Sequence, residues 1–285
     1  MSNPVGAEEP AILFTEAEWN TALPIVTEEM NVFLRPYRTP LFIDHGDHGE
    51  GHGSGSFFEI WGQKFVLTNQ HVAEVRADKK PLGVRYEGQD DMMVLGGNHV
   101  EQRWPWDLGL IPVSDGAWTA LPHAAKTITV DQIGMAQTAY PNEIFAFSGY
   151  AGQNTSFYFD TMFLGATTSL SCEAELPADD RWDPRFHFGL NYRPDRAATV
   201  VGDRGLPVPP GLSGSTVWNT CFVEAKANGI AWTPELAKVA GVVWGWPSSV
   251  GLIVSTRSEH VRSFVLGAVE ALAEAANAPA GAATS

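Results

Sequence analysis

The sequence predicts an all-β protein that ends in one long helix. Short apolar runs, such as 57–61, 144–147 and 240–244, are bounded by Gly, Pro, Asn or Asp, which is typical of strands joined by tight turns. The chain has 285 residues, of which 44% are hydrophobic and 28 are glycine. A chain of this size and composition can bury one large core or two smaller ones.

The first 37 residues are expected to form an extension that precedes the β-rich body. Thr15 and Glu18 have the spacing of a capping box, which predicts a helix from Glu16 to about Leu23. Pro24 is expected to end this helix, because proline lacks the backbone N–H that a helix interior needs. We expect the extension either to pack on the body or to contact a partner.

Three polar residues beside predicted strands follow one another in the order His, Asp, Ser. Each adjoins an apolar run: His71 follows 65–67, Asp107 precedes 108–111, and Ser213 precedes 216–218. A serine hydroxyl becomes a nucleophile when a neutral imidazole takes its proton, and His71 is the candidate base. The imidazole in turn needs a carboxylate on its other nitrogen, and Asp107 is the candidate. The three residues predict a catalytic triad.

The turn around Ser213 is suited to stabilising a negatively charged oxygen. Backbone N–H groups in a glycine-bearing turn can point at the oxygen of a tetrahedral intermediate, and Gly211 and Ser213 are the candidate donors of this oxyanion hole. Gly211 and Gly214 also let a substrate backbone come close. The turn therefore predicts an accessible nucleophile.

Other nucleophile arrangements fit the sequence less well. In an α/β-hydrolase the serine precedes its acid and its histidine, and the motif Gly-x-Ser-x-Gly leads into a helix. Here Ser213 comes last, Ser215 stands at the final glycine position, and a strand is expected to follow. Cys221 lies in the strand-like apolar run 219–223, where a thiol behaves as a small hydrophobic group. A cysteine nucleophile is therefore not expected.

These segments together resemble the trypsin/chymotrypsin-like serine peptidases, and most of all their bacterial members. The resemblance extends from about Arg38 to Phe264 and is carried by 53–57, 67–72, 107–110 and 211–214. It implies two packed antiparallel six-stranded β-barrels, with the triad in the cleft between them and a helix at the C-terminus. The implied activity is that of a serine endopeptidase, which forms an acyl-enzyme intermediate and needs no cofactor.

The resemblance also divides the chain into segments. The expected order is an extension at 1–37, a first barrel at 38–120 with His71 and Asp107, a second barrel at 121–257 with Ser213, a helix at 258–276 and a flexible tail at 277–285. Pro112, Gly116 and Pro122 mark the connection between the barrels. The helix has Ser258 as its expected N-cap and carries an apolar stripe. That stripe consists of Val261, Phe264, Val265 and Leu272.

Substrate preference is implied by the same resemblance. Pro207 stands near the expected base of the primary specificity pocket, where no carboxylate is present to hold a Lys or Arg side chain. The walls would come from Trp244, Gly245, Trp246, Gly251 and Ile253. We expect cleavage of protein or peptide substrates after small or apolar residues. Val243 departs from the family, which usually has a small hydroxyl residue before this Trp-Gly pair.

A second departure concerns activation. Digestive members pair a cleaved N-terminus with an aspartate just before the nucleophile, and this chain has Leu212 there. An aliphatic side chain cannot form that ion pair, so we expect activity to be constitutive or set by an activating protein partner. The alternative function is a catalytically silent module that binds a peptide or protein. Ser215, in place of the family's second glycine, and the Trp-rich strand favour this alternative.

Composition restricts partners and compartment. A net charge of −15, with 33 acidic and 18 basic residues, argues against nucleic-acid binding. No signal-peptide pattern or membrane-length apolar stretch is evident, and only two cysteines are present. We therefore expect a cytoplasmic location and no membrane partner. Pairing of Cys172 with Cys221 stays open, although a reducing compartment disfavours it.

The segment 44–52 carries three histidines and three carboxylates among glycines. Such residues can bind Zn²⁺ or Ca²⁺, but their spacing matches no metal site, and the glycines predict a hairpin tip. We expect no metal here. A metal-dependent protein organised around His45, His48 and His52 is the weakest alternative.

Overall fold

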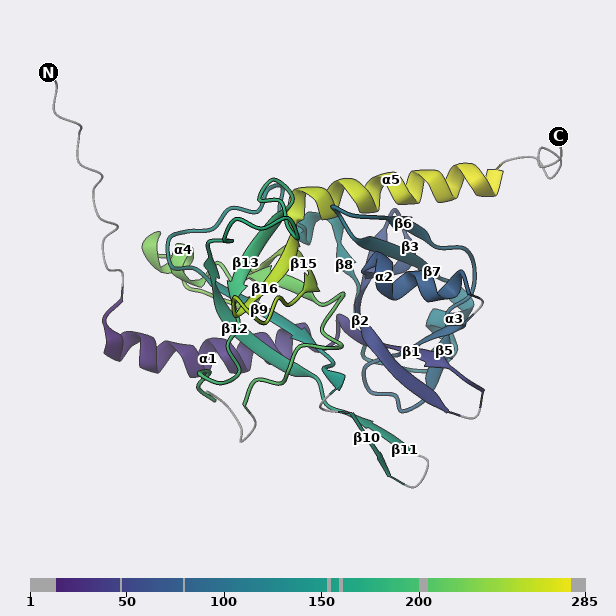
Figure 1. The fold of residues 1–285 in the computed structure, drawn as a ribbon, viewed down its shortest axis with the longest axis horizontal. Coiled ribbons are helices and arrows are strands. Elements are labelled where there is room, and N and C mark those ends of the chain that lie inside the picture. The colour runs from purple at the N-terminus through teal and green to yellow at the C-terminus, as the bar shows by residue number, and fades with distance from the viewer. Residues whose placement is uncertain are drawn as a thin grey trace, which may run out of the picture.

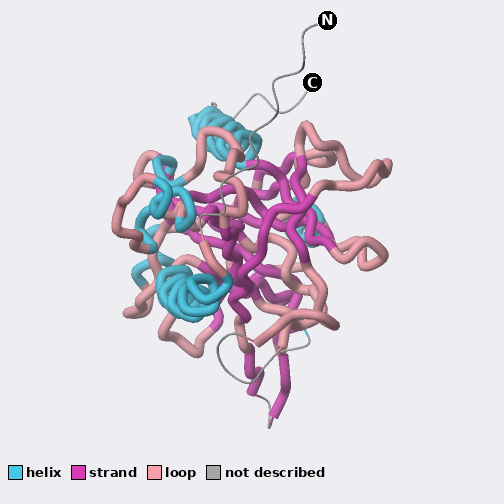
Figure 2. Tube along the Cα trace, turned by 90° about the vertical axis from the view of Figure 1, so that its left-hand side faces the viewer, coloured by secondary structure: helices cyan, strands magenta, loops and turns pink. Residues whose placement is uncertain are grey.

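The computed structural model describes residues 14–277, except 47, 79, 153–154, 159–160 and 200–204. Strands dominate the described chain, and helices lie on its periphery (Figures 1 and 2). The strands are β1 (Arg38–Asp44), β2 (Gly49–Ile60), β3 (Gln63–Thr68), β4 (Leu82–Arg85), β5 (Met92–Val94), β6 (Val100–Gln102), β7 (Leu108–Val113), β8 (Ile128–Thr129), β9 (Ile144–Gly149), β10 (Thr155–Tyr158), β11 (Thr161–Leu164), β12 (Thr167–Ala174), β13 (His187–Asn191), β14 (Thr216–Asn219), β15 (Lys238–Gly245) and β16 (Leu252–Arg257). The α-helices are α1 (Glu16–Leu34), α2 (Gln70–Ala73), α3 (Asp115–Thr119), α4 (Phe222–Ala227) and α5 (Ser258–Asn277).

The predicted fold class is confirmed. In the second half of the chain, β12, β13, β16, β15, β14 and β9 pair in that order into a closed antiparallel barrel. The first half forms a sheet in the order β5, β4, β1, β2, β3, β7 and β6. Each unit has its own apolar core, centred on residues such as Phe57 and Val66 in the sheet and Phe147 and Ile253 in the barrel.

The first unit differs from the predicted closed barrel in one respect. Its edge strands β5 and β6 are three residues each and are not hydrogen-bonded to each other in the described part of the chain. The intervening segment 95–99 contains Gly96 and Gly97, which disfavour strand pairing. Because these edge strands of the described chain do not pair, the unit is an open sheet. Short β8 adds to β2 in parallel.

A third apolar cluster joins the two units. It contains buried side chains from β2, β3, β7, β9, β14 and β15, and α1 and α5 cover it. Figure 1 shows α5 running across the molecule from the barrel to the first sheet. The predicted C-terminal helix is confirmed, since Val261, Phe264 and Val265 are buried in this cluster and Leu272 packs at its edge.

The N-terminal helix is longer than predicted. Its capping box is present, with Glu18 N–H donating to Thr15 and the Glu18 carboxylate accepting from the Thr15 N–H. The prediction that Pro24 ends it is wrong, because α1 continues to Leu34 with Pro24 on an exposed position. The second half of α1 buries Val26 and Met30 in the third cluster, and this burial outweighs the cost of the proline.

The strand expected around Cys221 is also absent. β14 ends at Asn219, Cys221 has a left-handed backbone with φ of 53°, and α4 begins at Phe222. Buried Glu143 explains the break, because its carboxylate accepts the N–H groups of Val223 and Glu224 at 3.0 Å and so caps α4. None of the helices in the described chain has the length and apolar character that crossing a bilayer requires.

Candidate active site

His71 is presented by a short helix at the end of β3. The strand buries Phe65 and Leu67, and Asn69 then leads into α2. Val72 and Ala73 of α2 pack into the core of the first sheet, whereas the His71 side chain is 44% exposed. The helix is therefore anchored on one side and offers the imidazole to solvent on the other.

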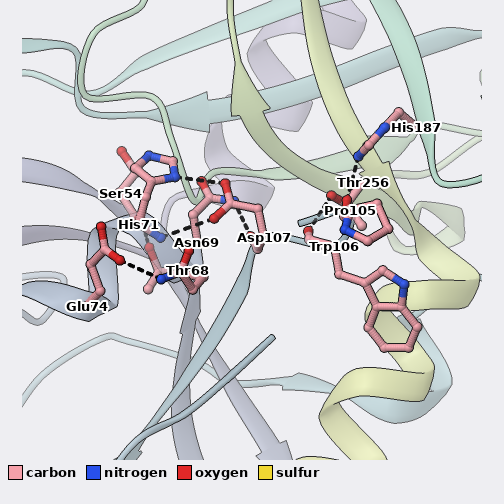
Figure 3. Close-up of polar contacts among 11 residues, drawn as sticks. Ser54, Thr68, Asn69, His71, Glu74, Pro105, Trp106, Asp107, His187 and Thr256 are labelled. Atoms are coloured by element: carbon pink, nitrogen blue, oxygen red, sulfur yellow. Dashed lines mark hydrogen bonds and ion pairs between the residues drawn. The ribbon is translucent and has the colours of Figure 1, made fainter. Parts of the chain in front are cut away.

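Asp107 contacts His71 directly, as Figure 3 shows. Its Oδ2 lies 2.7 Å from His71 Nδ1, and its Oδ1 accepts the backbone N–H of His71 at 3.1 Å. The backbone of Asp107 is left-handed, with φ of 46°, and its carbonyl accepts from Asn69 Nδ2 at 2.8 Å. Gly109 lets β7 approach, because a Cβ there would lie 2.8 Å from the Cβ of Ala73. When Nδ1 donates to the carboxylate, Nε2 keeps the lone pair that a base needs.

The loop before Asp107 is also held by the barrel. His187 Nε2 lies 2.6 Å from the carbonyl oxygen of Pro105, and Thr256 Oγ1 donates to the carbonyl of Trp106 at 2.8 Å (Figure 3). The backbone N–H of Asp183 donates to His187 Nδ1 at 3.0 Å, so the proton of this imidazole is on Nε2. Burial lowers the pKa of His187, in keeping with a neutral ring.

The turn around Ser213 is built from successive hydrogen-bonded peptides. Its backbone contacts are Leu212 N–H to Pro209 at 2.8 Å, Ser215 N–H to Leu212 at 3.0 Å, Gly214 N–H to Val243 at 2.9 Å, Gly152 N–H to Pro210 at 2.8 Å and Ser54 N–H to Ser213 at 2.9 Å. Gly211 and Gly214 have φ of 98° and 88°, which only glycine adopts without strain. Among the described residues, the N–H groups of Gly211 and Ser213 have no hydrogen-bond acceptor.

Strand β2 brings the serine turn and the histidine helix together. A Cβ on Gly53 would lie 2.9 Å from Val72 Cγ1 and 3.5 Å from the carbonyl oxygen of Ser213. The described chain shows no hydrogen bond between Ser213 Oγ and His71 Nε2. Apo enzymes commonly have loose contacts at this point, which tighten when substrate binds.

Three of the residues predicted to form the specificity pocket are buried or covered by other side chains. Pro207 is buried, and its carbonyl accepts from the Tyr192 hydroxyl at 2.7 Å. Ile253 is 0% exposed inside the barrel core, so its side chain does not face solvent. Gly251, with φ of 65°, is covered by the side chain of Arg193.

The Trp-rich end of β15 contains a bulge. Val243 pairs with Ser255 and Gly245 with Val254, so Trp244 has no partner on β16. Bulges of this kind reorient a side chain and are frequent beside active sites. In the described chain the indole nitrogens of Trp244 and Trp246 are buried without a hydrogen-bond partner.

The histidine-rich segment does not gather into a metal site among the described residues. His45 contacts Glu50 at 3.0 Å and stacks on His48. The Nε2 of His52 is buried and without a partner in the described chain, and burial lowers the pKa of this residue. Asp47 lies outside the described residues.

Both cysteines are free, so no disulfide joins Cys172 and Cys221. Burial, followed by the nearby carboxylates of Glu143 and Glu224, raises the pKa of the Cys221 thiol to about 12. Burial also raises the pKa of Cys172. Thiols of this kind stay protonated near neutral pH and are poor nucleophiles.

Comparison with known structures places the fold. The Rv3671c protease from M. tuberculosis, in its active form, aligns with a TM-score of 0.50 at 15% identity, over 86% of each chain. The serine protease domain of the Sesbania mosaic virus polyprotein aligns with a TM-score of 0.46 at 14% identity, over 81% of this chain and 92% of that chain. The chain has a chymotrypsin-like fold. No family model and no curated protein matches it.

Several residues that support this site in the chymotrypsin-like fold were not predicted from the sequence. They are Ser54, Asn69, Gly152, His187 and Thr256. Ser54 and Asn69 lie within the segments 53–57 and 67–72, which the sequence analysis singled out. Their place in these segments could therefore have indicated that they support the site. Gly152, His187 and Thr256 carry no local signal, because their partners lie far along the chain.

Proposed function

We propose that the protein is a serine endopeptidase that cleaves protein or peptide substrates through His71, Asp107 and Ser213. The observation that carries the proposal is the 2.7 Å contact between His71 Nδ1 and Asp107 Oδ2 beside the serine turn. A neutral imidazole oriented in this way can take a proton at Nε2. The chymotrypsin-like fold supports the peptidase class by likeness of architecture alone.

The proposed reaction follows from these groups. Ser213 Oγ attacks the carbonyl carbon of the scissile peptide while His71 Nε2 takes the hydroxyl proton, and Asp107 stabilises the resulting imidazolium. The tetrahedral oxygen accepts hydrogen bonds from the N–H groups of Gly211 and Ser213. His71 then gives its proton to the leaving amine, which leaves an ester on Ser213. Water, deprotonated by His71, attacks the ester, releases the acid and restores the serine.

The unpartnered N–H groups in the described turn support this assignment of the oxyanion hole. Loss of one such donor typically lowers kcat by about 10²- to 10³-fold. No cofactor is needed for any step. We propose that the substrate lies along Trp244, Gly245 and Trp246, and that the residue before the cut is small or apolar, because Pro207 offers no carboxylate. Membership of the bacterial type, an activating partner and a cytoplasmic location stay predictions.

A catalytically silent binding module is the second candidate. The lack of a hydrogen bond between Ser213 Oγ and His71 Nε2 in the described chain favours it. Such a module would use the same cleft to hold a peptide without forming an ester. The two candidates differ in whether Ser213 is activated.

Labelling by a fluorophosphonate probe distinguishes them, because the probe reacts with an activated serine. We expect the native protein to be labelled and the Ser213→Ala and His71→Ala variants to lose labelling. Ser215→Ala is the matched control, since Ser215 lies in the same turn with a buried hydroxyl. Folded native protein that takes no label would contradict the peptidase and support the silent module.

A further inference from the structure

Ser54 of β2 joins four segments of the site. Its N–H donates to the carbonyl of Ser213 at 2.9 Å, and its Oγ donates to the carbonyl of Gly211 at 2.7 Å. The same Oγ accepts the N–H of Tyr150 at 2.9 Å, and the Ser54 carbonyl accepts from Thr68 Oγ1 at 2.8 Å (Figure 3 shows the last contact). Ser54 as a whole is 1% exposed, so water does not compete for these bonds.

Two glycines allow the backbone to close around Ser54. A Cβ on Gly149 would lie 3.0 Å from Ser54 Oγ, and a Cβ on Gly214 would collide with the carbonyl oxygen of Ser54. A third glycine, Gly211, approaches the carbonyl oxygen of Tyr150, which a Cβ there would meet at 2.5 Å. Ser54 therefore packs directly against the backbone of the serine turn.

Tyr150 is itself held in place. The guanidinium of Arg38 lies 5.9 Å from the centre of its ring and bonds the hydroxyls of Ser148 and Thr168. Thr168 Oγ1 in turn donates to Asn31 Oδ1 of α1 at 2.7 Å. The residue whose backbone N–H donates to Ser54 therefore belongs to a network of contacts that reaches α1.

Within the described segment 210–213 each backbone carbonyl has a donor, and that of Gly211 is the one held by a side chain, the hydroxyl of Ser54. The carbonyls of Pro210 and Leu212 are held by the N–H groups of Gly152 and Ser215, and that of Ser213 by the backbone of Ser54. The carbonyl of Gly211 accepts from Ser54 Oγ. The N–H of the same peptide, that of Leu212, donates to Pro209 at 2.8 Å, so the Ser54 bond is the second of its two anchors. Because the backbone of glycine is permissive, loss of this bond would let Gly211 change its backbone angles.

The buried side chain of Leu212 cannot supply a polar anchor for the turn. We infer that Ser54 is a positioning residue that keeps the Gly211 and Ser213 N–H groups directed at the substrate carbonyl. The inference rests on the proposed peptidase function. Ser54 itself does not touch the reacting atoms.

Hydrogen exchange of the full-length protein tests the positioning role without requiring activity. Ser54→Ala should increase amide exchange in the segment 209–215 by about 10-fold, because one of the hydrogen bonds that order the turn is lost. Ser56→Ala is the matched control: it is also 1% exposed on β2, but its hydroxyl contacts Thr216 Oγ1 at 3.0 Å. The control should exchange as the native protein does in this segment.

Kinetics supply a second readout. Ser54→Ala should lower kcat on a cleaved peptide by about 10- to 100-fold with KM changed less than 2-fold, because the oxyanion forms only in the transition state. If Ser54→Ala does not fold, Ser54→Cys replaces it, because the thiol has a similar shape and is a weak donor.

The outcomes separate the two proposals. Exchange at 209–215 that is unchanged in Ser54→Ala, or a kcat equal to that of Ser56→Ala, would overturn the positioning role. If the native protein takes no fluorophosphonate label but Ser54→Ala exchanges its amides faster at 209–215, the peptidase proposal is overturned. The role of Ser54 in ordering the turn is then kept.

Discussion

Gly245 leaves open space at the proposed substrate-binding strand, since no described atom outside Gly245 and its two chain neighbours lies within 4 Å of the position its Cβ would occupy. It stands between Trp244 and Trp246, which are half-buried. A substrate backbone can therefore run along this part of β15. A side chain added at Gly245 would enter the same space.

We predict that a peptide-library profile shows cleavage after small or apolar residues. Gly245→Val should lower kcat/KM by at least about 10-fold for the substrates with the largest of these residues before the cut. The reason is that a steric clash with bound substrate costs more than roughly 1 kcal/mol. Gly267→Val on α5 is the control, because Gly267 also has open space and lies outside the site. Rapid cleavage after Arg or Lys would show that the pocket is not apolar.

At the residue scale, the sequence analysis could propose a role for a residue when the neighbouring sequence indicated it. His71 and Asp107 could be proposed because each adjoins a strand, and the structure brings them to 2.7 Å. Ser54 could not be assigned a role in the same way. Its partner Gly211 is 157 residues away, and only the packing of the two units reveals the contact.

At the element scale, α1 shows how tertiary packing overrides a local rule. A proline in a helix interior costs roughly 3 kcal/mol. Each fully buried apolar side chain contributes about 1.5–3 kcal/mol, and α1 buries Val26, Met30 and Leu34 after Pro24. The sequence identified the cap at Thr15, which depends on neighbours, and missed the continuation, which depends on a core made by other elements.

Replacing Pro24 should therefore stabilise the protein. Pro24→Ala restores an N–H that can donate to the carbonyl of Asn20, and Pro24 is exposed, so no core contact is lost. We expect the free energy of unfolding in urea to rise by about 1–3 kcal/mol. Glu29→Ala, also exposed on α1, should change it by less than about 0.5 kcal/mol. A less stable Pro24→Ala protein would mean that the helix needs the proline to dock.

At the scale of the whole molecule, the two units are joined by polar as well as apolar contacts. The third apolar cluster and α5 span both. His187 and Thr256 add hydrogen bonds from the barrel to the loop before Asp107. The loop that orients His71 therefore depends on the packing of the barrel against the first sheet.

This joint is expected to weaken in acid. Burial is the largest influence on the pKa of His187 and lowers it. The contacts with Pro105 and Asp183 raise this pKa and offset burial only in part, and nearby His260 lowers it further. The unfolded chain binds a proton near pH 6.5 while the folded chain does not, so stability falls as the pH drops below about 6.5, by up to about 1.4 kcal/mol per pH unit for one proton.

Urea unfolding between pH 5 and 8 measures this effect. His187→Gln should be less stable than the native protein at pH 8, because it loses the contact with Pro105, and its stability should fall less steeply toward pH 5. His45→Gln, at the histidine-rich tip, is the matched control. A native slope in His187→Gln would show that another group carries the pH dependence.

The contact between Ser54 and Gly211 has a consequence for the order in which the site is made. A chain emerging from the ribosome carries His71 and Asp107 long before residue 213 is synthesised. The barrel that holds the serine turn closes only when β16 pairs with both β13 and β15. Contacts of such long sequence separation form late, because the loop between them must first be closed. A nascent chain therefore carries the proposed base and its carboxylate before it carries either the nucleophile or the barrel that holds the loop before Asp107. The proposed activity begins only after β16 has been synthesised and paired.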